Sequence, residues 1–173
     1  MSRHMPEILE LASYRNRSST VSGQLSTAAM ARLRDVGAAA DEAVVSLTLT
    51  AENRGDIELS GHVESSIGLT CQRCLDPVEV PLVSEFEFVI MDAADAQSGD
   101  EESADVIVVD DGMLRLRELV EDELLLSLPV VARHDVDWPC RPLSQQFGPA
   151  DESAPARDNP FAVLADLKRD RED

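Results

Sequence analysis

Hydrophobic and polar side chains alternate along several stretches of the chain, and the two longest cover residues 57–70 and 78–90. In each, apolar side chains take every second position and polar or acidic side chains fill most of the positions between them. This period of two is typical of a strand with one buried face and one solvated face. We therefore predict two long half-buried strands, with Pro81 at a sheet edge or a bulge because proline cannot donate a ladder hydrogen bond.

Shorter segments add strands to this sheet. Residues 44–51 alternate in the same way, and the turn-forming sequence Asn-Arg-Gly-Asp at 53–56 follows them, so they should form a hairpin with the strand at 57–70. Residues 18–25 alternate weakly, and the apolar run at 106–109 has the length of a short buried strand. The sequence thus predicts at least five strands, most of them antiparallel neighbours.

Three segments have helical signals. Residues 114–128 carry leucine and valine at helical spacing with acidic residues on the opposite side, and Pro129 ends the pattern. Residues 27–36 follow the potential cap Ser26 and are rich in good helix formers. Residues 160–169 begin with proline and end with basic residues, which is typical of a short helix.

These elements together predict an α+β fold: an antiparallel sheet, with a barrel-like curl as one form it can take, one main packed helix and short terminal helices. Residues 1–40 form an N-terminal strand and helix segment in this interpretation, and residues 41–138 form the α+β core domain with a Cys-x-x-Cys turn between its two long strands. Residues 139–173 are predicted to be an irregular proline-rich segment followed by the short C-terminal helix.

Charge narrows the classes of function. The 173 residues have a formal net charge of −19, and the first 40 residues, with five arginines and three acidic residues, are the exception to this acidic balance. A body this acidic repels phosphate backbones, so a general nucleic-acid surface is not expected, whereas a basic protein would be attracted. Residues 92–105 contain six acidic residues and no periodicity, and we expect a flexible, solvent-facing loop there.

The sequence also predicts the compartment. The first residues lack the apolar stretch of a secretory signal, and no apolar run approaches the ~20 residues that span a bilayer. We expect a cytoplasmic protein with reduced thiols and no membrane contact. In that setting a Cys-x-x-Cys pair is more typical of metal binding or catalysis than of a structural disulfide.

The chain has three cysteines, and two of them form the pair Cys71 and Cys74 in Cys-Gln-Arg-Cys. His134 and Cys140 lie closely spaced later in the chain and can supply a second pair of ligands for zinc. Two alternatives remain: buried thiols without a metal, and a redox-active dithiol. Redox chemistry of the thioredoxin type needs a helix after the pair, but Pro77 and the alternation that follows predict a strand.

Three blocks of sequence resemble one known family. Residues 69–77, Leu-Thr-Cys-Gln-Arg-Cys-Leu-Asp-Pro, resemble the signature of the YceD family, the large ribosomal RNA subunit accumulation proteins of bacteria and plastids. The predicted helix with the following 128–134 segment resembles the second block, and residues 159–168 resemble the terminal block. The order and spacing match over essentially the whole chain.

The resemblance implies a non-enzymatic accessory factor of ribosome large-subunit biogenesis, needed for large-subunit ribosomal RNA to accumulate. It implies a ribosomal protein or pre-ribosomal particle as partner, with no small-molecule substrate, and leaves direct contact with the RNA open. The sequence itself agrees with the expectation of a non-enzymatic protein, because it contains no phosphate-binding glycine-rich loop and no nucleophile triad. Two other functions stay open: an acidic escort for a basic ribosomal protein, and a thiol- or zinc-based regulatory protein.

Candidate partner contacts complete the prediction. Arg73 lies inside the cysteine turn, where it can meet a partner's carboxylate or a phosphate, or pair with a local acid such as Asp76 or Glu79. The predicted C-terminal helix has an apolar face and a basic end that must dock on the chain itself or on a partner. These further partner-binding candidates are Phe161, Leu164, Leu167, Lys168 and Arg169.

Overall fold

The fold is seen in a computed structural model that describes residues 4–14, 18–51, 57–93, 105–135 and 140. Residues Met1–Cys140 form one compact unit, and Arg141–Asp173 form a second unit that lies outside the described residues. The predicted C-terminal helix, with its five candidate contacts, and most of the predicted acidic loop also lie outside them.

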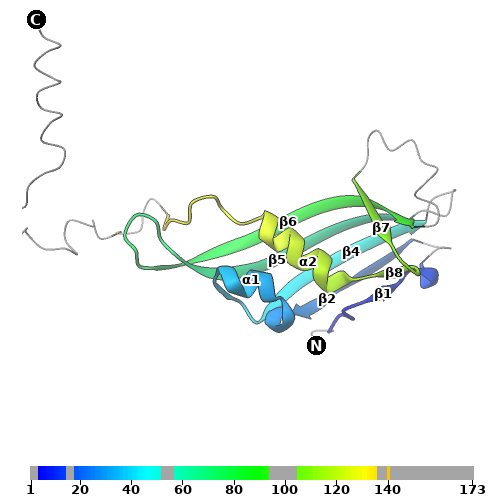
Figure 1. Ribbon diagram of the computed structural model, residues 1–173, viewed down its shortest axis with the longest axis horizontal. Helices are drawn as coiled ribbons and strands as arrows, with labels where there is room; N and C mark the ends of the chain where they lie inside the picture. The colour runs from blue at the N-terminus through cyan, green and yellow to red at the C-terminus, as the bar shows by residue number, and fades with distance from the viewer. Residues whose placement is uncertain (1–3, 15–17, 52–56, 94–104, 136–139, 141–173) are drawn as a thin grey trace, which may run out of the picture. The chain divides into compact units, whose positions relative to one another are not determined.

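The first unit is built on one large curled sheet, a half-barrel in form (Figure 1). The strands follow the order β2-β4-β5-β6-β7, and β3 pairs with β5 off this path. The strands of this sheet are β2 (Ser19–Ser26), β3 (Ala38–Ala39), β4 (Glu42–Ala51), β5 (Ile57–Thr70), β6 (Pro77–Asp92) and β7 (Val106–Val109). The predicted hairpin of β4 with β5 and the cysteine turn between β5 and β6 are both confirmed.

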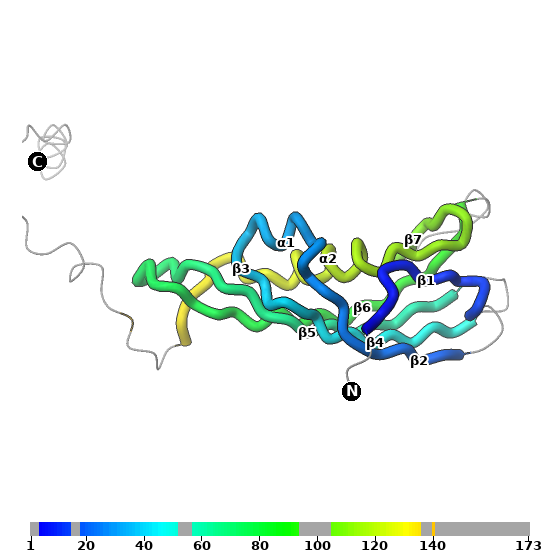
Figure 2. Tube along the Cα trace, turned by 90° about the horizontal axis from the view of Figure 1, so that it is seen from below, coloured from blue at the N-terminus to red at the C-terminus, as the bar shows by residue number. Residues whose placement is uncertain are grey.

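Helices cover one face of the sheet, and the two views agree on this (Figures 1 and 2). The remaining elements are β1 (Leu9–Glu10), η1 (Leu11–Ser13), η2 (Thr27–Ala29), α1 (Ala31–Val36), β8 (Met113–Leu114) and α2 (Leu116–Leu126). The main helix α2 contacts β5 and β6, and the small ladder of β1 with β8 lies beside its start. Among the described residues, no helix is both long enough and apolar enough to span a membrane.

The core follows from the period of two in the sequence. The odd-numbered apolar residues of β5 and the even-numbered apolar residues of β6 lie on the inner face of the sheet, while the glutamates between them face solvent. Gly61 breaks the apolar pattern of β5 for a steric reason. It lies opposite Phe86, whose ring occupies the space that a Cβ at position 61 would need. The missing side chain at position 61 thus makes room for the ring of Phe86.

The predicted fold class is confirmed: the sheet is curled and largely antiparallel, with one main helix packed on it, although β7 runs parallel to the end of β6. Two predictions about element bounds need correction. The main helix is shorter than 114–128, because Leu114 pairs with Leu9 in the β1–β8 ladder. The segment 27–36 is divided into η2 and α1 at Met30, whose side chain is fully buried and whose backbone leaves the helical region there.

Two local predictions hold. The Ser26 side chain accepts a hydrogen bond from the backbone N–H of Ala28, as expected for a cap, although it caps the 3-10 turn. Pro81 lies on the open edge of β6: among the described strands, β7 is the other neighbour of β6 and pairs only with Val89–Asp92. A proline without an N–H is tolerated on such an edge.

Candidate metal centre

A tight turn at the end of the β5–β6 hairpin presents the first two cysteines. The backbone N–H of Cys71 donates to the carbonyl oxygen of Asp76 at 2.9 Å, and the N–H of Leu75 donates to the carbonyl oxygen of Cys71 at 2.9 Å. Leu75 has φ 63°, in the left-handed region, which lets the chain reverse directly after Cys74. Both cysteines are fully buried beneath this turn.

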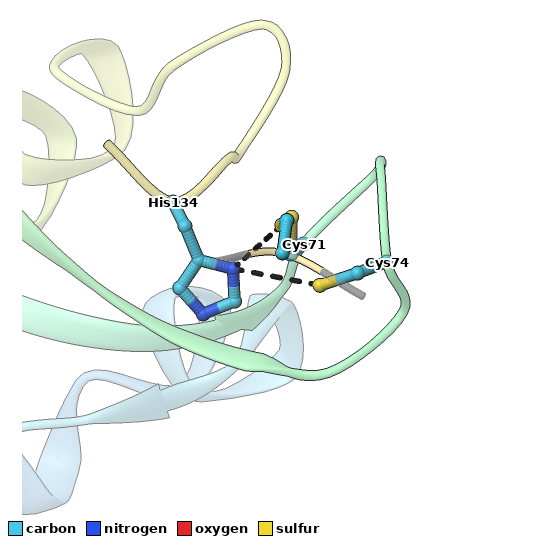
Figure 3. A group of neighbouring side chains, drawn as sticks. Cys71, Cys74 and His134 are labelled. Carbon is cyan, nitrogen blue, oxygen red and sulfur yellow. Dashed lines mark hydrogen bonds between the residues drawn. The ribbon is translucent and has the colours of Figure 1, made fainter. Parts of the chain in front are cut away.

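The segment after α2 brings the other two side chains to the same place. It is tied to the turn by a backbone hydrogen bond of 2.9 Å, from the N–H of Gln72 to the carbonyl oxygen of Ala132. His134 follows two residues later, and its ring nitrogen Nδ1 faces the labelled cysteines in Figure 3. Cys140 completes the group, so one cluster forms from two regions about sixty residues apart in sequence.

The distances within this Cys3His cluster match a tetrahedral zinc site. The ligand atoms of Cys71, Cys74, His134 and Cys140 all lie within 4.8 Å of one another. The sulfurs of Cys71 and Cys140 are 3.7 Å apart, and Nδ1 of His134 is 3.5 Å from the sulfur of Cys74 and 3.3 Å from that of Cys140. With Zn–S bonds of about 2.3 Å, tetrahedral zinc separates two sulfurs by roughly 3.8 Å, and a sulfur and a nitrogen by roughly 3.5 Å.

The orientation of His134 also suits a ligand. Its Nε2 lies 3.0 Å from the carbonyl oxygen of Pro77. A carbonyl oxygen only accepts, so Nε2 carries the proton, and in the neutral ring the lone pair of Nδ1 points at the sulfurs. Metal-binding histidines commonly have their second nitrogen fixed by such a hydrogen bond.

The electrostatics of the cluster favour a thiolate at Cys71. Burial raises the pKa of the Cys71 thiol, but hydrogen bonds from backbone N–H groups, those of Arg73 and His134 foremost, outweigh burial and lower this pKa to about 5. Burial and a hydrogen bond to Cys140 raise the pKa of Cys74 to about 12. A hydrogen bond to the Cys140 sulfur raises the pKa of His134. Without a metal, the four ligand atoms lie close together and share few protons. A bound cation would take the place of those protons and offset the negative charge of the thiolates.

The surroundings separate the three interpretations of the thiols. Cys71, Cys74, Val78 and Ala132 form a small apolar core of their own at the hairpin end. Among the described residues no disulfide joins the three cysteines, and the Cys-x-x-Cys pair is buried in a strand-to-strand turn. Thiol exchange requires an accessible thiolate, so the burial argues against a redox dithiol. The Nδ1 atom of His134 faces the sulfurs, which argues against the interpretation as buried thiols without a metal.

Arg73 lies beside the cluster rather than in an ion pair with its predicted acids. A hydrogen bond with the Cys140 sulfur raises the pKa of the Arg73 guanidinium. Glu79, one of the two predicted partners, instead accepts a hydrogen bond from Ser66 at 2.8 Å. Among the described residues, no ion pair joins Arg73 to Asp76 or Glu79. Its positive charge offsets negative charge on the Cys71 and Cys140 sulfurs, whose thiol pKa values are lowered.

Two contributors to this site, the carbonyl groups of Pro77 and Ala132, were not predicted from the sequence. The first fixes the tautomer of His134, and the second ties the segment after α2 to the cysteine turn. Both act through the backbone, so no side-chain type marks them in the sequence.

Fold and cluster together define a class: a mostly β protein whose longest hairpin ends in a Cys3His cluster of the zinc-ligand type. The chain belongs to the YceD family, whose model, described as large ribosomal RNA subunit accumulation protein YceD, matches residues 59–168. The matched region includes all four residues of the cluster. The resemblance found in the sequence is thereby confirmed.

One relative shows how far the similarity extends. The large ribosomal RNA subunit accumulation protein YceD of Haemophilus influenzae is 33% identical over 131 residues, which cover 74% of this chain and 75% of that protein. No solved structure matches the chain.

Proposed function

We propose that the protein is a non-enzymatic accessory factor that supports the accumulation of large-subunit ribosomal RNA by binding a protein component of the large subunit. The observation that carries the proposal is membership of a family named for that accumulation, over a match that covers β6, α2 and the cluster. The curated relative bears the same name.

Charge supports a basic protein as the component that is bound. The net charge is −19, and the sheet face opposite the helices carries exposed Glu58, Glu64, Glu85 and Glu87. Such a surface attracts cations and repels phosphates over a distance of about 8 Å at physiological ionic strength. An escort for a basic ribosomal protein is therefore the more specific form of this proposal, and contact with bare RNA is its rival.

The Cys3His cluster has a structural role in this proposal: it holds one zinc ion that locks the segment after α2 to the hairpin end. Four protein ligands leave no open position for water or substrate, and closed sites of this kind are structural rather than catalytic. This supports a binding function. Arg73 at the cluster and Phe161, Leu164, Leu167, Lys168 and Arg169 near the C-terminus are the proposed partner contacts.

The cellular function is tested by deleting the gene and measuring the ratio of large-subunit to small-subunit ribosomal RNA. We expect the ratio to fall, the wild-type gene to restore it, and a Cys71→Ser/Cys74→Ser gene to restore it less than a Gln72→Ala gene expressed at the same level. An unchanged ratio after deletion contradicts the proposal.

The partner and the metal are tested on the purified chain. Binding to basic large-subunit proteins should weaken as salt rises, and large-subunit RNA alone should not bind at sub-micromolar affinity in physiological salt. Sub-micromolar binding of bare RNA would favour the rival. Metal analysis should return one zinc per chain, and protein purified without zinc that takes up none when zinc is added contradicts the structural role.

A further inference from the structure

Strand β6 presents an open edge along most of its length. Over Pro77–Asp92 one side of β6 pairs with β5, whereas its other side, within the described part of the chain, pairs only at Val89–Asp92, with β7. Figure 1 shows β6 as the outer strand of the sheet between the hairpin end and β7. An unpaired edge exposes a row of backbone donors and acceptors that can accept a further strand.

Two hydrogen bonds show which backbone groups point outward. The N–H of Val89 donates to the carbonyl oxygen of Asp105 on the β7 side, and the carbonyl oxygen of Pro77 accepts from His134. Both residues are odd-numbered, and residues of one parity in a strand point their backbone groups to the same side. The outward groups in between belong to Glu79, Pro81, Val83, Glu85 and Glu87, and no described residue hydrogen-bonds to them.

This open edge has two defined ends. His134 closes it at Pro77, and the segment that begins at Asp105 closes it at Val89. Glu79 to Glu87 spans roughly 26 Å at about 3.3 Å per residue, enough for a guest strand of about eight residues. A cleft of about 870 Å³ opens beside its first part, with Val80, Pro129 and Val131 in its lining.

The side chains along the edge select the guest. Glu79, Glu85 and Glu87 are exposed on the outer face of β6. A second copy of this chain paired antiparallel about Val83 would set Glu79 opposite Glu87, and like charges directly opposite are destabilising. A guest strand with Lys or Arg at every second position would instead place its cations beside these glutamates.

We propose that the open edge Glu79–Glu87 accepts an extended, basic segment of a partner protein as an additional strand of the sheet. The backbone groups supply the hydrogen bonds, and the three glutamates select alternating positive charge. The inference rests on the proposed function in taking the partner to be a basic protein, and it adds the site and the conformation in which that partner binds.

The probe is a ten-residue peptide that alternates Lys with Val or Thr, added to the zinc-loaded full chain. Amide exchange followed by NMR should slow by about tenfold or more at Val83, Glu85 and Glu87, whose N–H groups gain partners. Exchange at Leu82, Ser84 and Phe86 should change little, because these amides already pair with β5. A peptide of the same composition with its lysines in one block, and one with Glu in place of Lys, should bind at least about tenfold more weakly.

Variants separate edge pairing from simple charge attraction. Val83→Pro removes one outward N–H and should weaken peptide binding by about tenfold, whereas Val83→Thr keeps the N–H and should not. Glu85→Gln/Glu87→Gln should weaken binding by about three- to tenfold, and Glu58→Gln/Glu64→Gln, the same charge change on β5, by less than about twofold.

Three results overturn the proposal: no slowing at the outward amides, equal binding of the blocked-lysine peptide, or equal losses from the two charge variants. A dimer of the free chain that protects the same amides also overturns it, because the edge is then occupied by a second copy. The ribosomal RNA ratio in the deletion strain is measured separately. If the peptide does not bind but deletion of the gene still lowers the ratio, the open edge is refuted as the binding site and the proposed function is retained.

Discussion

The Nε2 atom of His134 lies 3.0 Å from the carbonyl oxygen of Pro77, the first residue of β6. This hydrogen bond turns Nδ1 toward the three sulfurs and ties the segment after α2 to the strand at the same time. His134 thus joins two parts of the fold and presents its lone pair to the cluster.

His134→Gln should lower zinc affinity by at least ~10-fold, because it removes one of four ligands. His134→Cys supplies a thiolate in its place and should retain zinc, which makes it the matched control. Competition with a chromophoric chelator at pH 7.5 measures both. Equal affinity of wild type and His134→Gln would remove His134 from the ligand set.

Removing zinc should open the hairpin end and leave the rest of the sheet folded, because the cluster has its own small apolar core. With a chelator, or in Cys74→Ser, the N–H of Gln72 should lose its hydrogen bond to Ala132 and exchange faster. Amides in the middle of β5 should keep their protection. Global unfolding on zinc removal contradicts a local role for the metal.

Without a metal, the Cys71 thiolate should persist well below the ordinary pKa of a cysteine. Backbone N–H groups more than offset burial and hold the pKa of Cys71 at about 5, compared with 9.0 for an unperturbed thiol. A depressed pKa stabilises the fold fully above about pH 9 and loses that contribution as pH falls toward 5. Thiolate absorbance at 240 nm should titrate near pH 5 and lose this step in Cys71→Ser. A single titration near pH 9 would contradict this prediction.

Gly61→Ala should destabilise the protein, because the new Cβ collides with the ring of Phe86 and with Leu47. Overpacking of this kind typically costs about 1–3 kcal/mol. Gly68→Ala on the same strand is the control, since its nearest contact would be 3.5 Å, an ordinary van der Waals distance. Urea unfolding measures both. Equal midpoints for the two variants would mean that Phe86 moves aside at little cost.

Glu121→Leu should destabilise the contact between α1 and α2. The buried carboxylate of Glu121 accepts from the backbone N–H of Leu33 and from Arg32, both at 3.1 Å. An unsatisfied buried donor costs about 1–3 kcal/mol. Asp122→Asn removes an exposed partner of the same Arg32 and should cost less than about 1 kcal/mol. Thermal unfolding compares the two, and a larger loss in Asp122→Asn would reverse the assignment.

The sequence by itself determined the long strands, the main helix and the members of the cluster. A period of two over 57–70 and 78–90 is a local property, set by which side chains can face an apolar core. Leucines at helical spacing near 116–126 act in the same way. The candidate ligands were recognisable because the chain has only three cysteines, and the chemistry of zinc selects few residue types.

The tertiary structure alone decided features that depend on distant partners. Three such features are the parallel direction of β7, the β1–β8 ladder that shortens the main helix, and the packing of the Phe86 ring against Gly61. Each depends on contact between segments that are far apart in the sequence, and the periodicity of one segment does not report such contacts. The tautomer of His134 depends on the carbonyl group of Pro77, and every residue has such a group. Backbone hydrogen bonds and close packing carry little signature in side-chain type, so only the folded chain shows which of them form.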